Sequence, residues 1–504
     1  MLRQVHSLLH RVAFRDLLPY TSGQALLPLS PLFLRDQNMT QTVQYAQPPL
    51  DFLPPNFDPK VLWMMKTALP VWMRWKSSVK TLNIQGAAGL IDLFHQFAAQ
   101  EARFLIAFRH PSPDDAYCLM NLLWNQLPQI SRELGKPLPR TPHVHFIYDR
   151  GIPLWAGDWI GGLYSRLGGT SIQRGKVDRQ GLKSARNLFA NGQFPMAAAP
   201  EGANNGHSEI VSPFEPGIAQ MGFWCADDLQ KAQRSESVFI VPLGIQYFYQ
   251  DAPWQPLADL LAQLEQEVGI QPAAVALPSE PEAIAQALYP RLVQLGWRLL
   301  AIMESYYSDF FEASFMPAET AVDQSANELA SRLNRLLNAA LQTAESFFQI
   351  PAQGSVIDRC RKIEQAGWDW IYREDLRPEK ALSPVERGLA DRIAEEATLR
   401  MWHMRLVESF VAVTGEYVQA KPSVERFAET LLLVQDTIAR IKGENPFPRP
   451  TLGDQIAYLA VGEPLSVSDR WSDYKSNRRQ AIADLTTDLQ TAVQALITSE
   501  KPTP

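Results

Sequence analysis

The stretch His110-Pro-Ser-Pro-Asp-Asp115 places a histidine five residues before a carboxylate, in the pattern H-x4-D. On a regular helix, five residues correspond to roughly 500° of rotation, so the two side chains would diverge unless the histidine stands outside the helix. Pro111 disfavours a helical conformation for His110, and Ser112 as N-cap with Pro113 at the first helical position makes a good helix start. We therefore expect Asp115 to hold Nδ1 of a loop histidine and to leave Nε2 free as a base. A simpler interpretation of Asp115 is a carboxylate that favours a helix N-terminus.

Four further segments follow this stretch in order. They are Gly168-Gly-Thr-Ser-Ile-Gln-Arg174, Pro200-Glu201-Gly202, Pro213-Phe214-Glu-Pro-Gly217 and Phe239-Ile-Val-Pro242-Leu. Each alone has an ordinary structural interpretation: Arg174 fits a solvated basic face, and Glu201 fits a polar turn. Their order after the H-x4-D pattern is more specific than any one of them.

Together these segments resemble the glycerolipid acyltransferase family, which includes the lysophosphatidic acid acyltransferases, over about residues 60 to 250. The resemblance implies an α/β fold with a mixed sheet flanked by helices, to which this chain adds a large all-helical region. It also implies that His110 is the general base and that Asp115 orients it. The residues implied to bind the acceptor or shape the site are Arg174, Glu201, Gly202, Asn204, Gly217 and Pro242.

The implied reaction is transfer of a fatty-acyl chain from a thioester, on acyl carrier protein or coenzyme A, to a hydroxyl of a lysophosphatidic acid-like glycerolipid. The expected partners are this donor as co-substrate, the lysolipid acceptor and a membrane surface. We expect no metal and no other cofactor. A thioester is already activated, so an alkoxide can attack it without a covalent enzyme intermediate.

Three positions depart from the family pattern. Asn204 stands where the family has an arginine able to pair with a phosphate, Glu215 stands where a basic residue is common, and Arg109 precedes the histidine in place of a small or amide residue. We expect Arg109 to supply part of the lost charge. Two alternatives stay open: an acyltransferase for a non-phosphorylated acceptor, and a non-catalytic membrane-surface lipid-binding protein of the same fold.

Composition and spacing argue against several other functions. The net charge of −7 disfavours nucleic-acid binding, and three scattered cysteines fit a reducing compartment better than a disulfide framework. A G-x-S-x-G elbow is absent from the sequence, and Gly169 to Lys176 has the wrong spacing for a phosphate loop. His143 and His145 alternate on a short apolar run and are interpreted as strand residues rather than metal ligands.

The sequence contains no stretch of about 18 uninterrupted apolar residues that would span a bilayer. Residues 61 to 80 instead mix tryptophan, methionine and basic residues, a pattern typical of a helix that lies in a membrane interface. We expect this segment to attach the protein peripherally to the cytoplasmic side of a membrane. The alternative is a helix packed on the core.

The 504 residues exceed a usual single domain. We expect an N-terminal tail and tether at 1–58, an acyltransferase core at 59–250, a helical region at 251–448 and a C-terminal strand and helix at 449–504. Apolar residues recur at helix spacing in the helical region. The expected core positions include Leu336, Leu341, Leu389, Ile393, Met401, Phe427 and Leu431.

The segment from Gln455 to Leu465 reads as an apolar strand followed by a turn. We expect it to pair with the sheet that carries 238–248, so that the helical region is an insertion into the core. A long insertion is tolerable because the entropy of closing a loop grows only logarithmically with its length. The alternative is a helical domain that simply ends the chain, with Gly462 to Pro464 as an exposed turn.

Overall fold

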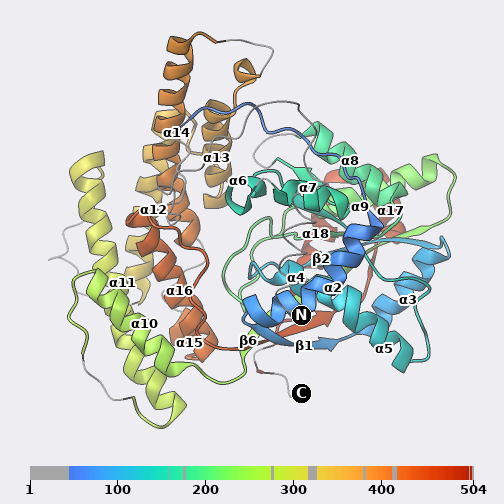
Figure 1. The fold of residues 1–504 in the computed structure, drawn as a ribbon, viewed down its shortest axis with the longest axis horizontal. Helices are drawn as coiled ribbons and strands as arrows, with labels where there is room; N and C mark the ends of the chain where they lie inside the picture. Colours follow the sequence, from blue (N-terminus) through green and yellow to red (C-terminus); the bar gives the residue numbers. More distant parts are fainter. Residues whose placement is uncertain are drawn as a thin grey trace, which may run out of the picture. The chain divides into compact units, whose positions relative to one another are not determined.

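A computed structural model describes residues 45–157, 159–173, 178–273, 277–315, 326–377, 382–410, 417–498 and 500–501. These residues form a mixed eight-stranded sheet covered by helices, and a second group of long helices beside it (Figure 1). The predicted α/β class with a mixed sheet and a large helical addition is therefore confirmed at this level.

The sheet has the strand order β1-β7-β6-β2-β5-β3-β4, and β8 pairs with β6 outside this path. The strands from β6 to β4 are mutually parallel, β1 is parallel to β7, and β7 and β8 run antiparallel to β6. The carboxyl ends of parallel strands meet at one edge, which is where open α/β sheets bind ligands. The strands are β1 (Val79–Gln85), β2 (Ala102–Phe108), β3 (His145–Asp149), β4 (Thr170–Ile172), β5 (Met196–Ala198), β6 (Ser237–Tyr249), β7 (Gln455–Val461) and β8 (Leu465–Ser466).

Helices cover both faces of the sheet. Successive side chains of β2 point to opposite faces, so Phe104 and Ile106 enter one apolar core while Leu105 and Ala107 enter another. The first core is covered by α2 (Pro59–Lys76), α3 (Ala87–Ala98), α4 (Asp115–Asn121) and α5 (Leu127–Glu133). The second is covered by α8 (Arg179–Asn191), α9 (Gly217–Lys231) and α18 (Arg478–Ala495).

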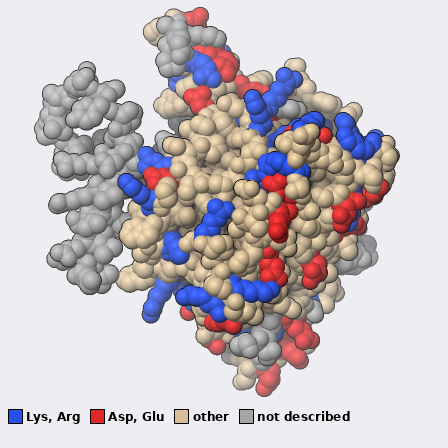
Figure 2. Space-filling view, turned by 90° about the vertical axis from the view of Figure 1, so that its right-hand side faces the viewer, with Lys and Arg blue, Asp and Glu red and all other residues tan. Residues whose placement is uncertain are grey.

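Shorter helices complete this part of the fold. The π-helical turn Leu122–Gln126 joins α4 to α5. The other short helices are α6 (Ile152–Ala156), α7 (Trp159–Arg166) and α17 (Trp471–Ser476). Figure 2, which faces the side of Figure 1 that carries α3 and α9, shows acidic and basic side chains interspersed on the surface. Surface ion pairs contribute little stability each, so the apolar cores hold these layers together.

The helical region has an apolar core of its own. Its members Leu336, Leu341, Phe427 and Leu431 are buried, as the helix spacing predicted. The region consists of α10 (Trp254–Glu267), α11 (Pro281–Phe311), α12 (Ala326–Phe348), α13 (Val356–Ile371), α14 (Pro384–Phe410), α15 (Tyr417–Ala420) and α16 (Val424–Ile441).

Two expected core residues of α14 lie on its outer side. Leu389 is 61% exposed and Ile393 is 39% exposed, whereas Ala390, Ala394 and Met401 are buried. The small alanine side chains face the neighbouring helices α12, α13 and α16, which allows close approach, and the larger residues point outward. The prediction for Leu389 and Ile393 was therefore wrong, because both sides of this helix carry apolar residues at helix spacing.

The strand β7 enters the sheet from beyond the helical region. It pairs antiparallel with β6, where Leu459 faces Ile245, and parallel with β1, where Leu459 faces Ile84. The expected pairing of 455–465 with the sheet that carries 238–248 is therefore confirmed, and the helical region lies between two adjacent strands. Gly462 donates its N–H to the Pro242 carbonyl at 2.9 Å, so this turn is attached to the sheet.

The described part of the expected tether, residues 45–58, is hydrogen-bonded to the fold near both of its ends. Gln47 donates to the Ile371 carbonyl in the helical region at 2.7 Å, and its own carbonyl accepts from Arg373 at 2.8 Å. Farther along, Asn56 donates to the Ser165 carbonyl beside the sheet at 2.9 Å. These residues are therefore attached by backbone hydrogen bonds to both parts of the fold. Residues 1–44 lie outside the described residues.

Candidate active site

His110 stands just beyond the carboxyl end of β2, in the loop before α4. Its Nδ1 lies 2.9 Å from Oδ2 of Asp115. The His110 side chain is 31% exposed, whereas that of Asp115 is 0% exposed. Among the described residues, none forms a hydrogen bond with Nε2 of His110. The predicted geometry of a loop histidine held through Nδ1 is therefore present.

The helix after His110 begins later than expected. It starts at Asp115 with Asp114 as its N-cap, rather than at Pro113 with Ser112 as N-cap. Ser112 instead belongs to a turn, in which its N–H donates to Oδ2 of Asp115 at 2.8 Å and its carbonyl accepts from the Asp115 N–H at 3.2 Å. This tight turn brings the Asp115 carboxylate back toward His110.

Tyr247 of β6 completes the surroundings of Asp115. Its hydroxyl donates a hydrogen bond to Oδ1 of Asp115 and also lies 3.7 Å from Sγ of Cys118. Burial raises the pKa of Asp115, while the hydrogen bonds from His110, Tyr247 and Ser112 lower it. Burial also raises the pKa of Tyr247 well above its usual value, so this hydroxyl stays protonated as a donor. Sequence reasoning missed Tyr247, although a tyrosine in an apolar strand needs a partner for its hydroxyl.

Glu201, which follows β5, fixes the backbone of the histidine. Its Oε1 accepts from the His110 N–H at 3.0 Å and lies 3.4 Å from Nε of Arg109. Its Oε2 accepts from Nδ2 of Asn205 at 3.1 Å and from the Ser212 N–H at 2.9 Å. With four donors around a fully buried carboxylate, Glu201 positions His110 and holds the 201–212 loop.

Arg109 does not face a ligand. Its guanidinium is fully buried and donates to the carbonyls of Ser208, of His207 at 3.0 Å and of Ile210 at 2.5 Å, in addition to its pairing with Glu201. We expected Arg109 to replace part of the charge that an arginine in the loop would carry. That expectation was wrong, because the guanidinium is fully buried and bonds to Glu201 and to three loop carbonyls.

No protein-family model, curated protein or solved structure matches this chain. The geometry of the site is therefore the basis for assigning a function.

The remaining predicted site residues lie in different surroundings. Gly202 has a left-handed φ of +72°, and a Cβ there would meet Oε1 of Glu215. Asn204 is exposed, and its Oδ1 accepts from the Gly206 N–H at 2.8 Å. The left-handed backbone favours glycine at position 202, whereas the Asn204 side chain stabilises a turn.

Pro242 and Gly217 belong to two other elements. Pro242 is buried in β6 beside Ala107 of β2, so it lies within the sheet next to the strand that precedes His110. Gly217 is exposed at the start of α9. Arg174 lies outside the described residues. The fold thus brings His110, Asp115 and Glu201 together beyond the ends of β2 and β5, whereas Pro242 lies within β6 opposite Ala107.

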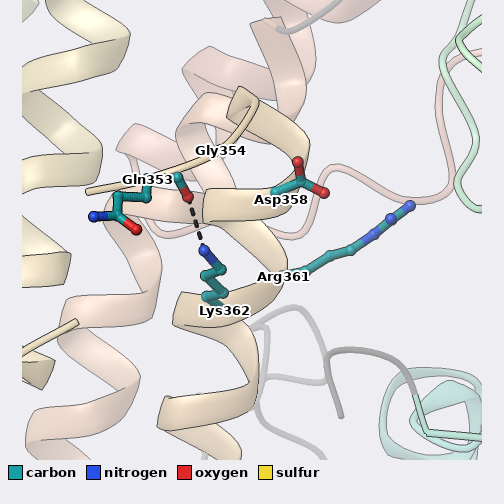
Figure 3. Close-up of a pocket in the computed structure, with 5 residues that line it drawn as sticks. All are labelled: Gln353, Gly354, Asp358, Arg361 and Lys362. Atoms are coloured by element: carbon teal, nitrogen blue, oxygen red, sulfur yellow. Dashed lines mark hydrogen bonds between the residues drawn. The ribbon is translucent and has the colours of Figure 1, made fainter. Parts of the chain in front are cut away.

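The helical region also reaches this edge of the sheet, through α13. Arg361 forms an ion pair with Glu215 beside Gly202, and a Cβ at Gly202 would lie 2.6 Å from Nη2 of Arg361. In Figure 3 Arg361 extends away from α13, while the neighbouring Lys362 donates to the Gln353 carbonyl at 2.8 Å. A positive charge therefore stands next to the loop in which Asn204 replaces the expected arginine.

The helix α2 and the residue after it contact the segment that carries His110 and Asp115. Oγ of Ser77, just after α2, donates to Oδ2 of Asp114 at 2.7 Å, and the Trp72 ring lies 4.2 Å from the Tyr117 ring. On its outer side Trp63 and Trp75 are each 70% exposed. Among the described helices, none is long and apolar enough to cross a membrane. The segment is thus a helix that packs on the core with one side and exposes aromatic residues on the other.

His143 and His145 are both buried and bonded to backbone. His143 Nε2 lies 2.9 Å from the Leu167 carbonyl, and His145 Nδ1 lies 2.9 Å from the Gly168 carbonyl. Burial lowers the pKa of His143 to about 4. His145 begins β3, whereas His143 precedes that strand. Both histidines therefore pack neutral beside the end of α7.

Proposed function

We propose that this protein is an acyltransferase that moves a fatty-acyl chain from an acyl thioester, on coenzyme A or acyl carrier protein, to a hydroxyl of a glycerolipid. The observation that carries the proposal is the 2.9 Å contact between His110 Nδ1 and the buried Asp115 carboxylate at the carboxyl end of β2. A partly exposed imidazole backed by a buried carboxylate is suited to act as a general base.

In the proposed reaction, Nε2 of His110 accepts the hydroxyl proton of the acceptor as its oxygen attacks the thioester carbonyl carbon. A C–O bond forms, the C–S bond breaks, and the leaving thiolate takes the proton back from the imidazolium. Asp115 stabilises the imidazolium through Nδ1, and Glu201 keeps the His110 backbone in place. Proximity and proton transfer are sufficient because the thioester is already activated.

A lysophosphatidic acid-like acceptor is the first candidate for the hydroxyl substrate. Arg361 supports it, because this guanidinium lies beside Gly202 in the loop that follows β5. A phosphate would compete with Glu215 for Arg361, since an arginine pairs with either anion in the same bidentate way. A non-phosphorylated acceptor is the second candidate, favoured by the burial of Arg109 and by the existing pairing of Arg361 with Glu215.

The exposed side of α2 supports peripheral attachment to a membrane. Trp63, Val71 and Trp75 are exposed there, and Arg74 lies beside Trp75 on the same turn of the helix. Tryptophan rings favour the headgroup depth of a bilayer, and neighbouring cations favour anionic lipid. Attachment through α2 would bring lipid substrates close to the loop before α4, which Ser77 contacts through Asp114.

The experiment that tests this proposal is an acyl-transfer assay with the purified full-length protein. Labelled acyl-coenzyme A and acyl carrier protein donors are each combined with lysophosphatidic acid, other lysophospholipids and monoacylglycerol. We expect a labelled diacyl product with at least one acceptor. Vesicle binding without any product would favour the non-catalytic lipid-binding alternative.

A further inference from the structure

A carboxylate of the helical region bonds to the loop that supports the candidate active site. Oε1 of Glu429, in α16, accepts from the Ser208 N–H at 2.9 Å. Its Oε2 accepts from the hydroxyl of Tyr417, in α15, at 2.7 Å. Glu429 therefore joins the helical region to the middle of the 201–212 loop.

Ser208 connects Glu429 to the surroundings of His110 and Asp115. Its carbonyl accepts from the guanidinium of Arg109, the residue that precedes His110. Its Oγ accepts from the Tyr247 N–H at 3.3 Å, and the hydroxyl of the same Tyr247 bonds to Asp115. Ser208 thus contacts both Arg109, which precedes His110, and Tyr247, which bonds to Asp115.

Other contacts hold the same stretch of loop against the helical region. The carboxylate of Glu209 accepts from Nη2 of Arg426 at 2.7 Å and from Nζ of Lys421 at 2.8 Å. The Arg426 guanidinium in turn lies over the Tyr417 ring at 4.5 Å. The loop around Ser208 thus takes its position from residues inserted between β6 and β7.

We propose that Glu429 is a positioning residue for the His110 site: through Ser208, its carboxylate fixes the loop that holds Arg109, Glu201 and Tyr247, so the helical region controls turnover. This inference rests on the proposed acyltransferase function. A displacement of about 1 Å at a reacting group can cost about 100-fold in rate, so a residue outside the site can set kcat through the loop.

The protonation of Glu429 should give the stability of the protein a pH dependence that is specific to this residue. Burial raises its pKa from the ordinary value of 4.5 to about 7. As the pH rises, Glu429 loses its proton in the unfolded chain before it does so in the folded protein. Glu429 therefore contributes to the free energy of unfolding at low pH, and this contribution is lost as the pH rises to about 7. The charged and titratable groups around Glu429 are Glu209, Lys421, Arg426 and Tyr417, with Glu425, Tyr249, His207 and Arg449 farther out.

The test compares Glu429→Ala with Glu425→Ala in the full-length protein, because a glutamine at 429 would keep an amide oxygen that can accept from the Ser208 N–H. Glu425 lies one turn earlier on α16 and accepts from the Tyr249 N–H at 3.3 Å, without contact to Ser208. We expect Glu429→Ala to lower kcat at least tenfold with KM changed less than about twofold, and Glu425→Ala to leave kcat within about twofold of wild type. Tyr417→Phe, which removes only one bond to Glu429, should lower kcat in the same direction and serves if Glu429→Ala does not fold.

Two further measurements separate this inference from the proposed function. The pH dependence of unfolding between about 4.5 and 7 should flatten in Glu429→Ala and persist in Glu425→Ala. Hydrogen exchange of residues 201–212 should be faster in Glu429→Ala than in wild type, whether or not the protein transfers acyl groups. A wild-type protein without transferase activity would overturn the proposed function alone. Unchanged kcat or unchanged exchange in Glu429→Ala would overturn the positioning role.

Discussion

The hydroxyl of Tyr247 donates a hydrogen bond to Oδ1 of Asp115, whose Oδ2 lies 2.9 Å from Nδ1 of His110. These two bonds fix the carboxylate from both sides, so Asp115 has one orientation toward the imidazole. The strand β6 therefore contributes a side chain to the site in addition to the backbone that pairs with β2.

Replacement of His110 by alanine should abolish acyl transfer and leave the fold intact. General-base catalysis is worth about 10² to 10⁴-fold, and removal of a partly exposed loop side chain opens no core cavity. Asp115→Asn should retain intermediate activity. Steady-state rates together with thermal unfolding curves check this prediction. A stable His110→Ala protein with wild-type turnover would contradict the assignment.

Tyr247→Phe should lower both stability and turnover. The change removes one donor from a buried carboxylate, which costs about 1.5 to 3 kcal/mol for a hydrogen bond to a charged group. Because that hydrogen bond lowers the pKa of Asp115, its loss should raise the pKa further and move the acid limb of the rate profile to higher pH. Urea unfolding and kcat against pH are the measurements. Tyr249→Phe, on the same strand, is the control and should leave the acid limb in place.

Arg361→Ala should discriminate between acceptors. If Arg361 binds the phosphate, kcat/KM for lysophosphatidic acid should fall, and the decrease should correspond to a loss of about 1.5 to 3 kcal/mol of transition-state stabilisation. The value of kcat/KM for monoacylglycerol should stay near that of the wild type. Lys362→Ala is the matched control, because Lys362 bonds to the Gln353 carbonyl and not to Glu215. An equal decrease for both acceptors would show that Arg361 acts on the fold rather than on a phosphate.

Trp63→Ala combined with Trp75→Ala should weaken binding to anionic vesicles. Both rings are 70% exposed on α2, so their removal takes apolar area from the membrane without disturbing the core. High salt should weaken binding only in part, since it screens the basic residues but not the rings. Co-sedimentation measures both effects. The control is Phe310→Ala with Trp370→Ala, which changes exposed aromatic residues of the helical region. Equal binding by both double variants would favour α2 as a purely structural helix.

The sequence by itself determined the parts of the fold that depend on local geometry. Pro111 keeps His110 outside the helix, and five residues are enough to bring Asp115 back to its Nδ1. The apolar run from Gln455 likewise indicated a strand, because a short continuous apolar run that ends in a turn is typical of a buried strand. Helix spacing also located the buried positions of α12 and α16.

The tertiary structure alone decided which distant groups meet. Tyr247 and Asp115 are 132 residues apart, Arg361 and Glu215 are 146 apart, and Ser208 and Glu429 are 221 apart. A pattern of apolar and polar residues indicates which side of an element is buried, but not which partner covers it. For the same reason the sequence could not show that Arg109 would be buried against Glu201 and the loop carbonyls, or that the alanines of α14 and not Leu389 would face the neighbouring helices.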